Sequence, residues 1–287
     1  MVLGEAGIGK TSLSEALAST AADAGFCVAW GRCTDGEAPA YWPWRQILRA
    51  LGGNSSHAFA AADGMAARET LFGSVASELE EATISGPTLV VLEDIHWADA
   101  SSLTLLRFIV GVVPDLPLVL VLTTRDDALE LSAVAAETLR ELPPAVRRVQ
   151  LVGLDRTSTE AILQREWPHA APQFVNEVYQ RTSGNPFFVQ EVAALRRLQG
   201  ERAGFAVPPG VAQVLGRRLA RLSQATQAVL AVASVIGDEI DPDLIALVAG
   251  RAIEDLMHLL EEAVRSRLVV RNGEALAFAH PLVRETL

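Results

Sequence analysis

The stretch that decides the fold is Gly4-Glu5-Ala6-Gly7-Ile8-Gly9-Lys10-Thr11. It fits the pattern G-x-x-x-x-G-K-[ST] at every fixed position. Its glycines allow backbone N–H groups to turn inward around a phosphate, in conformations that a Cβ would resist. The helix expected to begin near Lys10 directs the positive end of its dipole at the same anion. The stretch therefore predicts a nucleoside triphosphate site at a strand-to-helix turn.

Lys10 is the only lysine of the chain, and every other basic residue is an arginine. A compact ammonium reaches the β- and γ-phosphates in a way that the wide fork of arginine does not reproduce. Thr11 is expected to supply a hydroxyl to Mg²⁺, and Ser12 continues the phosphate-binding turn. The alternative is a glycine-rich turn with a chance lysine, which the complete motif and the helix after it disfavour.

A second apolar run, residues 88–92, ends in the two carboxylates Glu93 and Asp94. In sites of this kind one acid holds Mg²⁺ through water and the next orients or deprotonates the attacking water. By their order we assign the magnesium side to Glu93 and the water-positioning role to Asp94, although aspartate is the more usual residue at the first position. The alternative is a polar strand end that faces solvent. His96 and Trp97, just beyond, are expected to make structural rather than catalytic contacts.

A third apolar run ends in Thr123-Thr124-Arg125. This polar end should fall at the carboxyl edge of the sheet, where ligands bind in open α/β folds. Arg125 would there bind the γ-phosphate and report its loss. The alternative is a surface ion pair with Asp126 or Asp127. Asp99 is expected to be the N-cap of the helix that follows it.

Short strands alternate with helices over the first part of the chain. The apolar runs barely alternate with polar residues, as in strands covered on both faces, so we expect βαβ units and a mainly parallel sheet. The expected strands are residues 26–30, 88–92, 118–123 and 148–152. The expected helices are residues 11–24, 66–82, 101–112 and 129–141.

From about residue 156 the pattern becomes helical. The chain therefore divides into a P-loop core at 1–155, a helical lid at 156–204 and a winged-helix-like domain at 205–287, with a boundary loop at 201–210. Asn272-Gly273 between two apolar runs is typical of a hairpin turn. The expected helices are residues 158–167, 173–182, 186–198, 211–222, 224–235, 242–248 and 253–266.

The composition excludes several classes of protein. With 24 Lys plus Arg against 35 Asp plus Glu, the net charge is −11, which is unfavourable for coating a nucleic-acid backbone. Arg217, Arg218 and Arg221 are the notable basic cluster, and a solvated or interdomain face explains them. Two cysteines make neither a four-ligand zinc site nor a secreted disulfide framework. Neither a signal peptide nor a membrane span is evident, so we expect a cytoplasmic protein without a membrane partner.

Taken together, five motifs resemble the STAND class of signal-transduction ATPases, and above all the ATPase module of large LuxR-type transcriptional regulators and of related cyclase- or kinase-fused regulators. The likeness covers nearly the whole chain, and the combination of motifs is more specific than any one of them except the phosphate loop. The five motifs are Gly4 to Thr11, Leu92-Glu93-Asp94-Ile95-His96-Trp97-Ala98-Asp99, Thr123-Thr124-Arg125, Gly184-Asn185-Pro186-Phe187-Phe188 and Phe278-Ala279-His280-Pro281-Leu282-Val283-Arg284.

The resemblance implies a switch operated by ATP, ADP and Mg²⁺. ADP holds a closed state, and ATP, usually with an inducer or partner, opens it and allows self-association. It also implies that Pro186 lies against the base or ribose and that His280 lies near the β-phosphate. Ordinary helix-start chemistry is an alternative for Asn185 and Pro186, and a structural role is an alternative for His280.

The chain departs from the family at both ends. Members carry a longer first strand, normally the central one, and an upstream segment near the adenine, whereas only Met1-Val2-Leu3 precede Gly4 here. The last residues, 284–287, fall inside an expected helix. We therefore expect a fragment cut at both ends, with folding and adenine binding weakened.

Four functions are compatible with the sequence. We favour an ATP-binding, slowly hydrolysing switch, with any DNA contact made by a domain outside this chain. The second is an AAA-type or origin-recognition-like ATPase that acts directly on DNA, which a basic recognition helix would favour. The third is a small-molecule P-loop kinase, which the winged-helix-like end disfavours. The fourth is a fragment that binds nucleotide poorly.

Overall fold

The computed structural model describes residues 1–34, 36, 38–53, 59, 65–125, 132–168, 170–199, 207–237, 239–273 and 275–287. These residues form two compact units, one within 1–151 and the other within 152–287. Each unit is described by itself below. The further division of the second part at residue 204 stays a prediction.

The first unit is built on a five-stranded sheet in the order β2-β3-β4-β1-β5, in which every pair of neighbours is parallel. The strands are β1 (Val2–Leu3), β2 (Cys27–Arg32), β3 (Thr88–Glu93), β4 (Leu118–Thr124) and β5 (Val149–Gln150). The predicted α/β class with a mainly parallel sheet is confirmed. The expectation that the first strand is central is wrong, because β4 occupies the middle of the sheet and β1 lies between β4 and β5.

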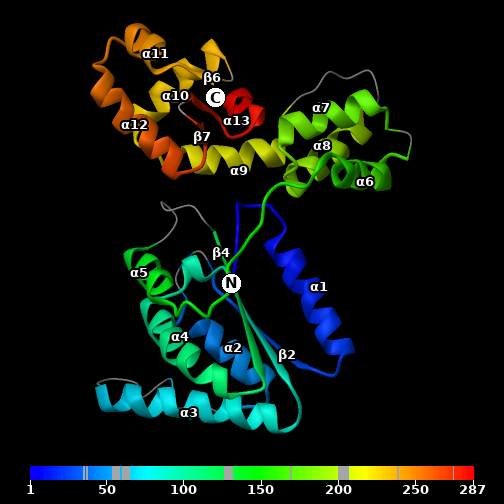
Figure 1. Ribbon diagram of the computed structural model, residues 1–287, viewed down its shortest axis with the longest axis vertical. Coiled ribbons are helices and arrows are strands. Elements are labelled where there is room, and N and C mark those ends of the chain that lie inside the picture. Colours follow the sequence, from blue (N-terminus) through cyan, green and yellow to red (C-terminus); the bar gives the residue numbers. More distant parts are fainter. Residues whose placement is uncertain are drawn as a thin grey trace. The chain divides into compact units, whose positions relative to one another are not determined.

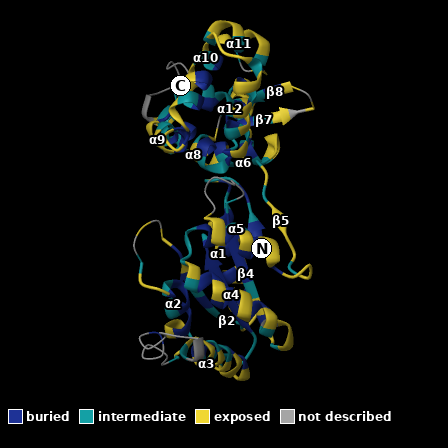
Figure 2. Ribbon diagram, turned by 90° about the vertical axis from the view of Figure 1, so that its left-hand side faces the viewer, coloured by how far each residue is buried: buried dark blue, intermediate teal, exposed yellow. Residues whose placement is uncertain are grey.

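Helices cover both faces of this sheet (Figure 1). They are α1 (Lys10–Asp23), α2 (Trp42–Ala50), α3 (Met65–Ile84), α4 (Ala100–Val112) and α5 (Ala133–Glu141). Leu89 and Val91 pack with α1 on one face, and Val90 and Leu92 pack with the other four helices on the opposite face. All of β3 is buried, whereas the outer face of α1 is exposed (Figure 2). Burial on both faces explains why the run 89–92 is continuously apolar.

Helix α2 was not predicted from the sequence, and it lies very close to β2. Its N-cap Tyr41 has a φ of 60°, and the indole N–H of Trp44 donates to the carbonyl of Ser102 over 3.1 Å. A Cβ on Gly31 of β2 would stand 2.5 Å from the carbonyl oxygen of Pro43. The glycine therefore lets the helix backbone rest directly on the edge strand.

The second unit is mostly helical. Its helices are α6 (Arg156–Glu166), α7 (Pro172–Thr182), α8 (Pro186–Gln199), α9 (Pro209–Leu219), α10 (Gln224–Ile236), α11 (Pro242–Ala249), α12 (Ile253–Arg265) and α13 (Pro281–Thr286). One apolar cluster joins α6, α7 and α8, and a larger one joins α9 to α13 with a three-stranded sheet. Phe188 of α8 belongs to the larger cluster, so this helix contributes to both.

The three-stranded sheet has the order β6-β8-β7, with β6 (Glu239–Ile240), β7 (Val269–Asn272) and β8 (Ala275–Phe278) all antiparallel. The predicted hairpin is present, but Asn272 pairs with Ala275 in the ladder, so that Gly273, with a φ of 67°, is the described turn residue. Strand β6 was not predicted. The winged-helix-like assignment of this region stays a prediction.

Two predicted segments reach residues that the structure does not describe. The predicted helix 129–141 begins at Ala133 in the structure with Ser132 as its N-cap, and residues 129–131 lie outside the described ranges. Of the predicted loop 201–210, residues 201–206 lie outside them, and α9 already begins at Pro209. Within the described parts of the chain, we find no helix with the length and apolar character needed to cross a membrane.

The contact between β2 and α2 predicts opposite effects for two glycines. Gly31→Ala should lower the free energy of unfolding by about 1–3 kcal/mol, because the new methyl meets backbone rather than a flexible side chain. Gly73→Ala, at an exposed position of α3, meets nothing within 4 Å and should raise the free energy of unfolding by about 0.5–1 kcal/mol. Urea unfolding of both variants measures the difference, and equal stabilities would contradict the close approach of α2.

Candidate nucleotide site

The phosphate loop has the backbone that its glycines predict. Gly7 has a φ of 77° and Gly9 a φ of 102°, both in the region that favours glycine. Gly4 is needed for space, because a Cβ there would stand 2.7 Å from the side chain of Ile8 and 3.2 Å from that of Leu151. Two of the fixed positions of the motif, Gly4 and Gly9, are thus explained by local geometry, and Gly7 adds a third glycine at a position where the motif allows any residue.

The lysine of the motif is folded onto its own loop. The Nζ of Lys10 donates to the carbonyls of Gly4 and Glu5, each over 2.8 Å, and the side chain is buried. Thr11 and Ser12 are exposed in the first turn of α1, where backbone N–H groups lack helical acceptors. Phosphate oxygens would therefore replace backbone carbonyls as the acceptors of the ammonium.

The register of the sheet brings the loop and the two acids to the same edge. The N–H of Asp94 donates to the hydroxyl of Thr123 over 3.0 Å, which ties the end of β3 to the end of β4. On the other side of β4, Val2 pairs with Thr123 and Leu3 pairs with Thr124. The phosphate loop and the acids therefore flank the carboxyl end of β4, which is where an open parallel sheet binds ligands.

Glu93 is buried, and its two oxygens have different surroundings. Oε2 lies 2.8 Å from the Nε of Arg32, its cross-strand neighbour on β2, whereas Oε1 has no hydrogen-bond partner among the described residues. Gln46 fixes the backbone of Arg32 from both sides, accepting its N–H over 3.3 Å and donating to its carbonyl over 3.0 Å. Sequence reasoning missed Arg32, because only the strand register reveals that it faces the acid.

Asp94 and Arg125 are linked through two aromatic rings. Asp94 has a φ of 54°, a conformation that aspartate tolerates better than most residues. The Nδ1 of buried His96 lies 3.9 Å from its Oδ1, and the His96 ring packs on Trp97 at 4.6 Å between centroids. The guanidinium of Arg125 lies 5.1 Å from the Trp97 ring centroid. The alternative partners of Arg125 at residues 126–127 lie outside the described part of the chain.

The interpretation of Asn185 and Pro186 as the start of a helix is confirmed. The Oδ1 of Asn185 accepts the N–H of Phe187 over 3.1 Å, and Pro186 is the first residue of α8. His280 is 5% exposed, and its ring meets Phe188 edge-on at 5.4 Å between centroids. The proposed contacts of Pro186 with the base and of His280 with the β-phosphate stay predictions.

Asp99 is the N-cap of α4, as expected. Its Oδ1 accepts the N–H of Ser102 over 2.9 Å, three residues into the turn. It therefore has a structural role at the helix start.

The residues present fit a magnesium ion bound together with a nucleotide. Within the described ranges there is no group of three or more His, Cys, Asp or Glu side chains that would hold a metal by itself. Mg²⁺ commonly binds through one or two carboxylates together with substrate phosphates. The buried, unpartnered Oε1 of Glu93 and the exposed hydroxyl of Thr11 suit that mode of binding.

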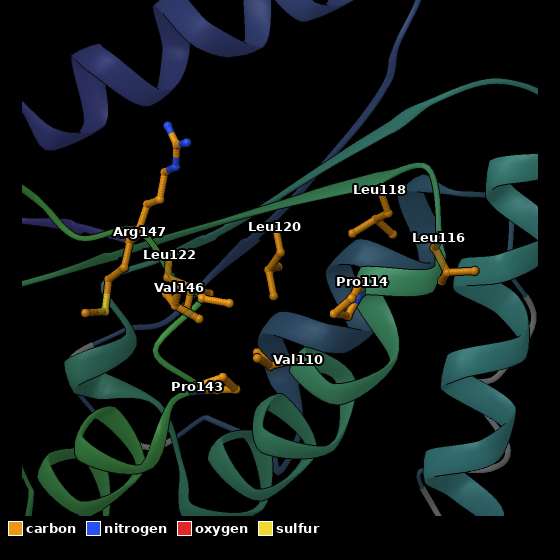
Figure 3. A pocket seen from close by; sticks show the side chains of 11 residues that line it. Val110, Pro114, Leu116, Leu118, Leu120, Leu122, Pro143, Val146 and Arg147 are labelled. Carbon is orange, nitrogen blue, oxygen red and sulfur yellow. The ribbon is translucent and has the colours of Figure 1, made fainter.

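A separate cavity of about 380 Å³ lies beside β4. Figure 3 shows Leu118, Leu120 and Leu122 of this strand along it, with Val110 and Pro143 opposite. Its lining contains one charged side chain, Arg147, and none of the predicted phosphate or metal residues. This cavity is therefore not the candidate nucleotide site.

Comparison with known proteins supports the ATPase assignment for the first unit. The family model described as an AAA ATPase domain matches residues 1–122. A Walker-type ATPase of Pyrococcus abyssi superposes with a TM-score of 0.67 at 15% sequence identity, covering 99% of this chain and 89% of that one. At this identity the likeness shows the fold, which is that of P-loop NTPases.

Two further proteins are similar to this chain. An uncharacterized protein of Rhizobium meliloti (strain 1021) is 27% identical over an alignment of 255 residues that covers 83% of this chain and 24% of the relative. The chain thus spans about a quarter of the length of that curated relative. A signal-transduction ATPase with a tetratricopeptide-repeat sensor from Pyrococcus horikoshii gives a TM-score of 0.48 at 18% identity, covering 99% of this chain and 39% of that one. At that score we infer nothing from it about this chain.

Cys33 provides a chemical probe of the acidic edge. Burial, with smaller contributions from Asp94 and Asp99, raises the pKa of its thiol to about 12, and its N–H donates to the carbonyl of Glu93 over 3.0 Å. At pH 8 the thiolate fraction is then on the order of one in ten thousand. Alkylation at pH 8 should label exposed Cys27 and spare Cys33, and denaturant should expose both. Mass spectrometry of the peptides measures this; equal labelling in the native protein would contradict the packing of this edge.

Proposed function

We propose that this chain is an ATP-binding, slowly hydrolysing switch module that regulates an attached effector in the cytoplasm. The observation that carries the proposal is the joint position of the phosphate loop and the two acids on either side of the carboxyl end of β4. The match of residues 1–122 to an AAA ATPase domain supports the same chemistry.

Each residue of the edge has a proposed role. Lys10 and the loop N–H groups bind the β- and γ-phosphates, and Thr11 and Glu93 hold Mg²⁺, which neutralises charge on the transferred phosphoryl group. Asp94 orients the attacking water and accepts its proton. Arg125, placed by the Trp97 ring, contacts the γ-phosphate and reports its loss.

Two contacts support a switch rather than a fast enzyme. Lys10 is satisfied by its own loop carbonyls, and Glu93 is paired with Arg32. A nucleotide and its metal would have to displace these partners, so binding would exchange contacts rather than only add them. A difference of this kind is what allows a ligand to shift a conformational equilibrium. ATP-dependent self-association, an inducer and an effector that regulates transcription belong to the proposal through the resemblance of the motifs.

The alternative of direct action on DNA is less well supported by the second unit. Helix α12, the last helix before the β7–β8 hairpin, exposes Glu254, Asp255 and Glu261, which repel phosphates. Arg218 is 7% exposed and donates to the carbonyls of Ser266 over 2.8 Å and Arg267 over 3.2 Å. The guanidinium of Arg218 is therefore occupied by contacts inside the unit, so fewer arginines of the cluster are available to bind a nucleic-acid backbone.

Nucleotide-dependent thermal stability tests the binding site. ATP-Mg or ADP-Mg at about 100 times its Kd should stabilise the folded chain by about 2.7 kcal/mol, because it binds only the folded state. Lys10→Ala should lose this gain while keeping its ligand-free midpoint. Thr20→Ala, an exposed change at the other end of α1, is the control and should keep it. If nucleotide stabilises the Lys10→Ala variant as much as it stabilises the wild type, the assignment of the nucleotide site is wrong.

Hydrolysis tests the division of roles between the acids. Asp94→Asn should bind ATP as tightly as the wild type and hydrolyse it about 100-fold more slowly or worse, because the amide cannot accept a proton from water. Asp99→Asn, a nearby aspartate that caps α4, should hydrolyse ATP normally, since asparagine caps a helix equally well. Phosphate release under single-turnover conditions measures both, and wild-type turnover in Asp94→Asn would assign the role to another residue.

A further inference from the structure

The metal-side acid already has a cation beside it. Glu93 is 4% exposed, and the Nε of Arg32 lies 2.8 Å from its Oε2. The other oxygen, Oε1, is buried and has no hydrogen-bond partner in the described part of the chain. A carboxylate in this position thus has one neutralised oxygen and one unused oxygen.

Arg32 is fixed at its backbone, whereas its side chain is accessible to solvent. The paired hydrogen bonds with Gln46 and the ladder pairing with Glu93 hold the main chain. The guanidinium lies 5.6 Å from the ring centroid of Trp30, and the Arg32 side chain is 56% exposed. Because solvent reaches the guanidinium of Arg32, this group can move away from Glu93 into water and does not become a buried charge without a partner.

We propose that Arg32 is the resident counter-ion of Glu93 and makes divalent metal binding at this acid conditional on nucleotide. This inference rests on the proposed function, because it takes Glu93 to be the magnesium-side acid. A guanidinium in contact with the carboxylate repels a divalent cation and already uses part of the negative charge that would attract it. A nucleotide triphosphate brings negative charge of its own, and only then does the metal outcompete Arg32 for Glu93.

The length of the acid suits this arrangement. An aspartate at position 93 would be one methylene shorter and would draw the carboxylate back from the Nε of Arg32. Glutamate therefore provides the reach for the cross-strand pair, which gives a physical reason for the departure from the more usual aspartate.

Binding of Mn²⁺ alone, followed by the electron paramagnetic resonance signal of the free ion, tests the inference on the folded chain. Without nucleotide, Arg32→Gln should bind Mn²⁺ at least about tenfold more tightly than the wild type, because one repelling charge is removed. Arg32→Lys, which keeps the charge, should stay close to the wild type. With a non-hydrolysable ATP analogue present, the wild type should bind Mn²⁺ more tightly than without it, because the triphosphate adds negative charge that helps the metal displace Arg32.

Two controls connect the effect to Glu93. The double variant Arg32→Gln, Glu93→Gln should lose the gain. Arg107→Gln, which removes the exposed pair with Glu141 at 2.7 Å, should change nothing. If Arg32→Gln does not fold, Glu93→Asp replaces it, since the shorter acid should also bind Mn²⁺ more tightly without nucleotide.

Three results would overturn the inference. They are an Arg32→Gln variant that binds Mn²⁺ no better than the wild type without nucleotide, a gain that survives the loss of Glu93, and wild-type Mn²⁺ binding that the ATP analogue does not strengthen. Failure of nucleotide binding itself would be seen separately in the thermal-stability test with Lys10→Ala. The Mn²⁺ measurement without nucleotide can therefore succeed or fail on its own.

Discussion

The hydrogen bond from the N–H of Asp94 to the hydroxyl of Thr123, 3.0 Å long, holds the end of β3 against the end of β4. Because β1 pairs with the opposite side of β4 at the same level, the phosphate loop and the acids are separated by one strand. Asp94 has a φ of 54° at this point, and the chain turns there into the segment that carries His96 and Trp97. A valine at position 123 would fill the same space and remove the acceptor, so the edge depends on a buried hydroxyl.

Local sequence was sufficient to predict the phosphate loop and most strands of the sheet. The turn conformations at Gly7 and Gly9 depend on the absence of a Cβ, which is a property of the residue itself. The run 89–92 is continuously apolar because helices cover both of its faces, and the same rule located β4. The cap at Asn185 and the hairpin at Gly273 were predicted on similar local grounds.

What the sequence left undetermined depends on contacts between distant segments. Helix α2 begins at Trp42 after Tyr41, a left-handed N-cap without a side-chain cap, so Pro43 in its first turn is the one ordinary start signal. Its position follows from Gly31 on another element. The pairing of Arg32 with Glu93 follows from the register of two strands that are distant in sequence. Arg218, in a cluster interpreted as a solvated or interdomain face, is instead buried against two carbonyls near the end of α12.

Two cations of different shape lie at the acidic edge. Lys10, the single lysine, is a point charge held by two loop carbonyls, and Arg32 is a planar fork held by Glu93. Binding of a triphosphate and its metal would exchange these contacts for new ones rather than add to them. The affinity for nucleotide therefore depends on the difference in free energy between the contacts that are lost and the contacts that are formed. Small changes elsewhere in the protein that favour one set of contacts would alter this affinity. This exchange of contacts is a physical argument for the proposed role as a nucleotide-operated switch.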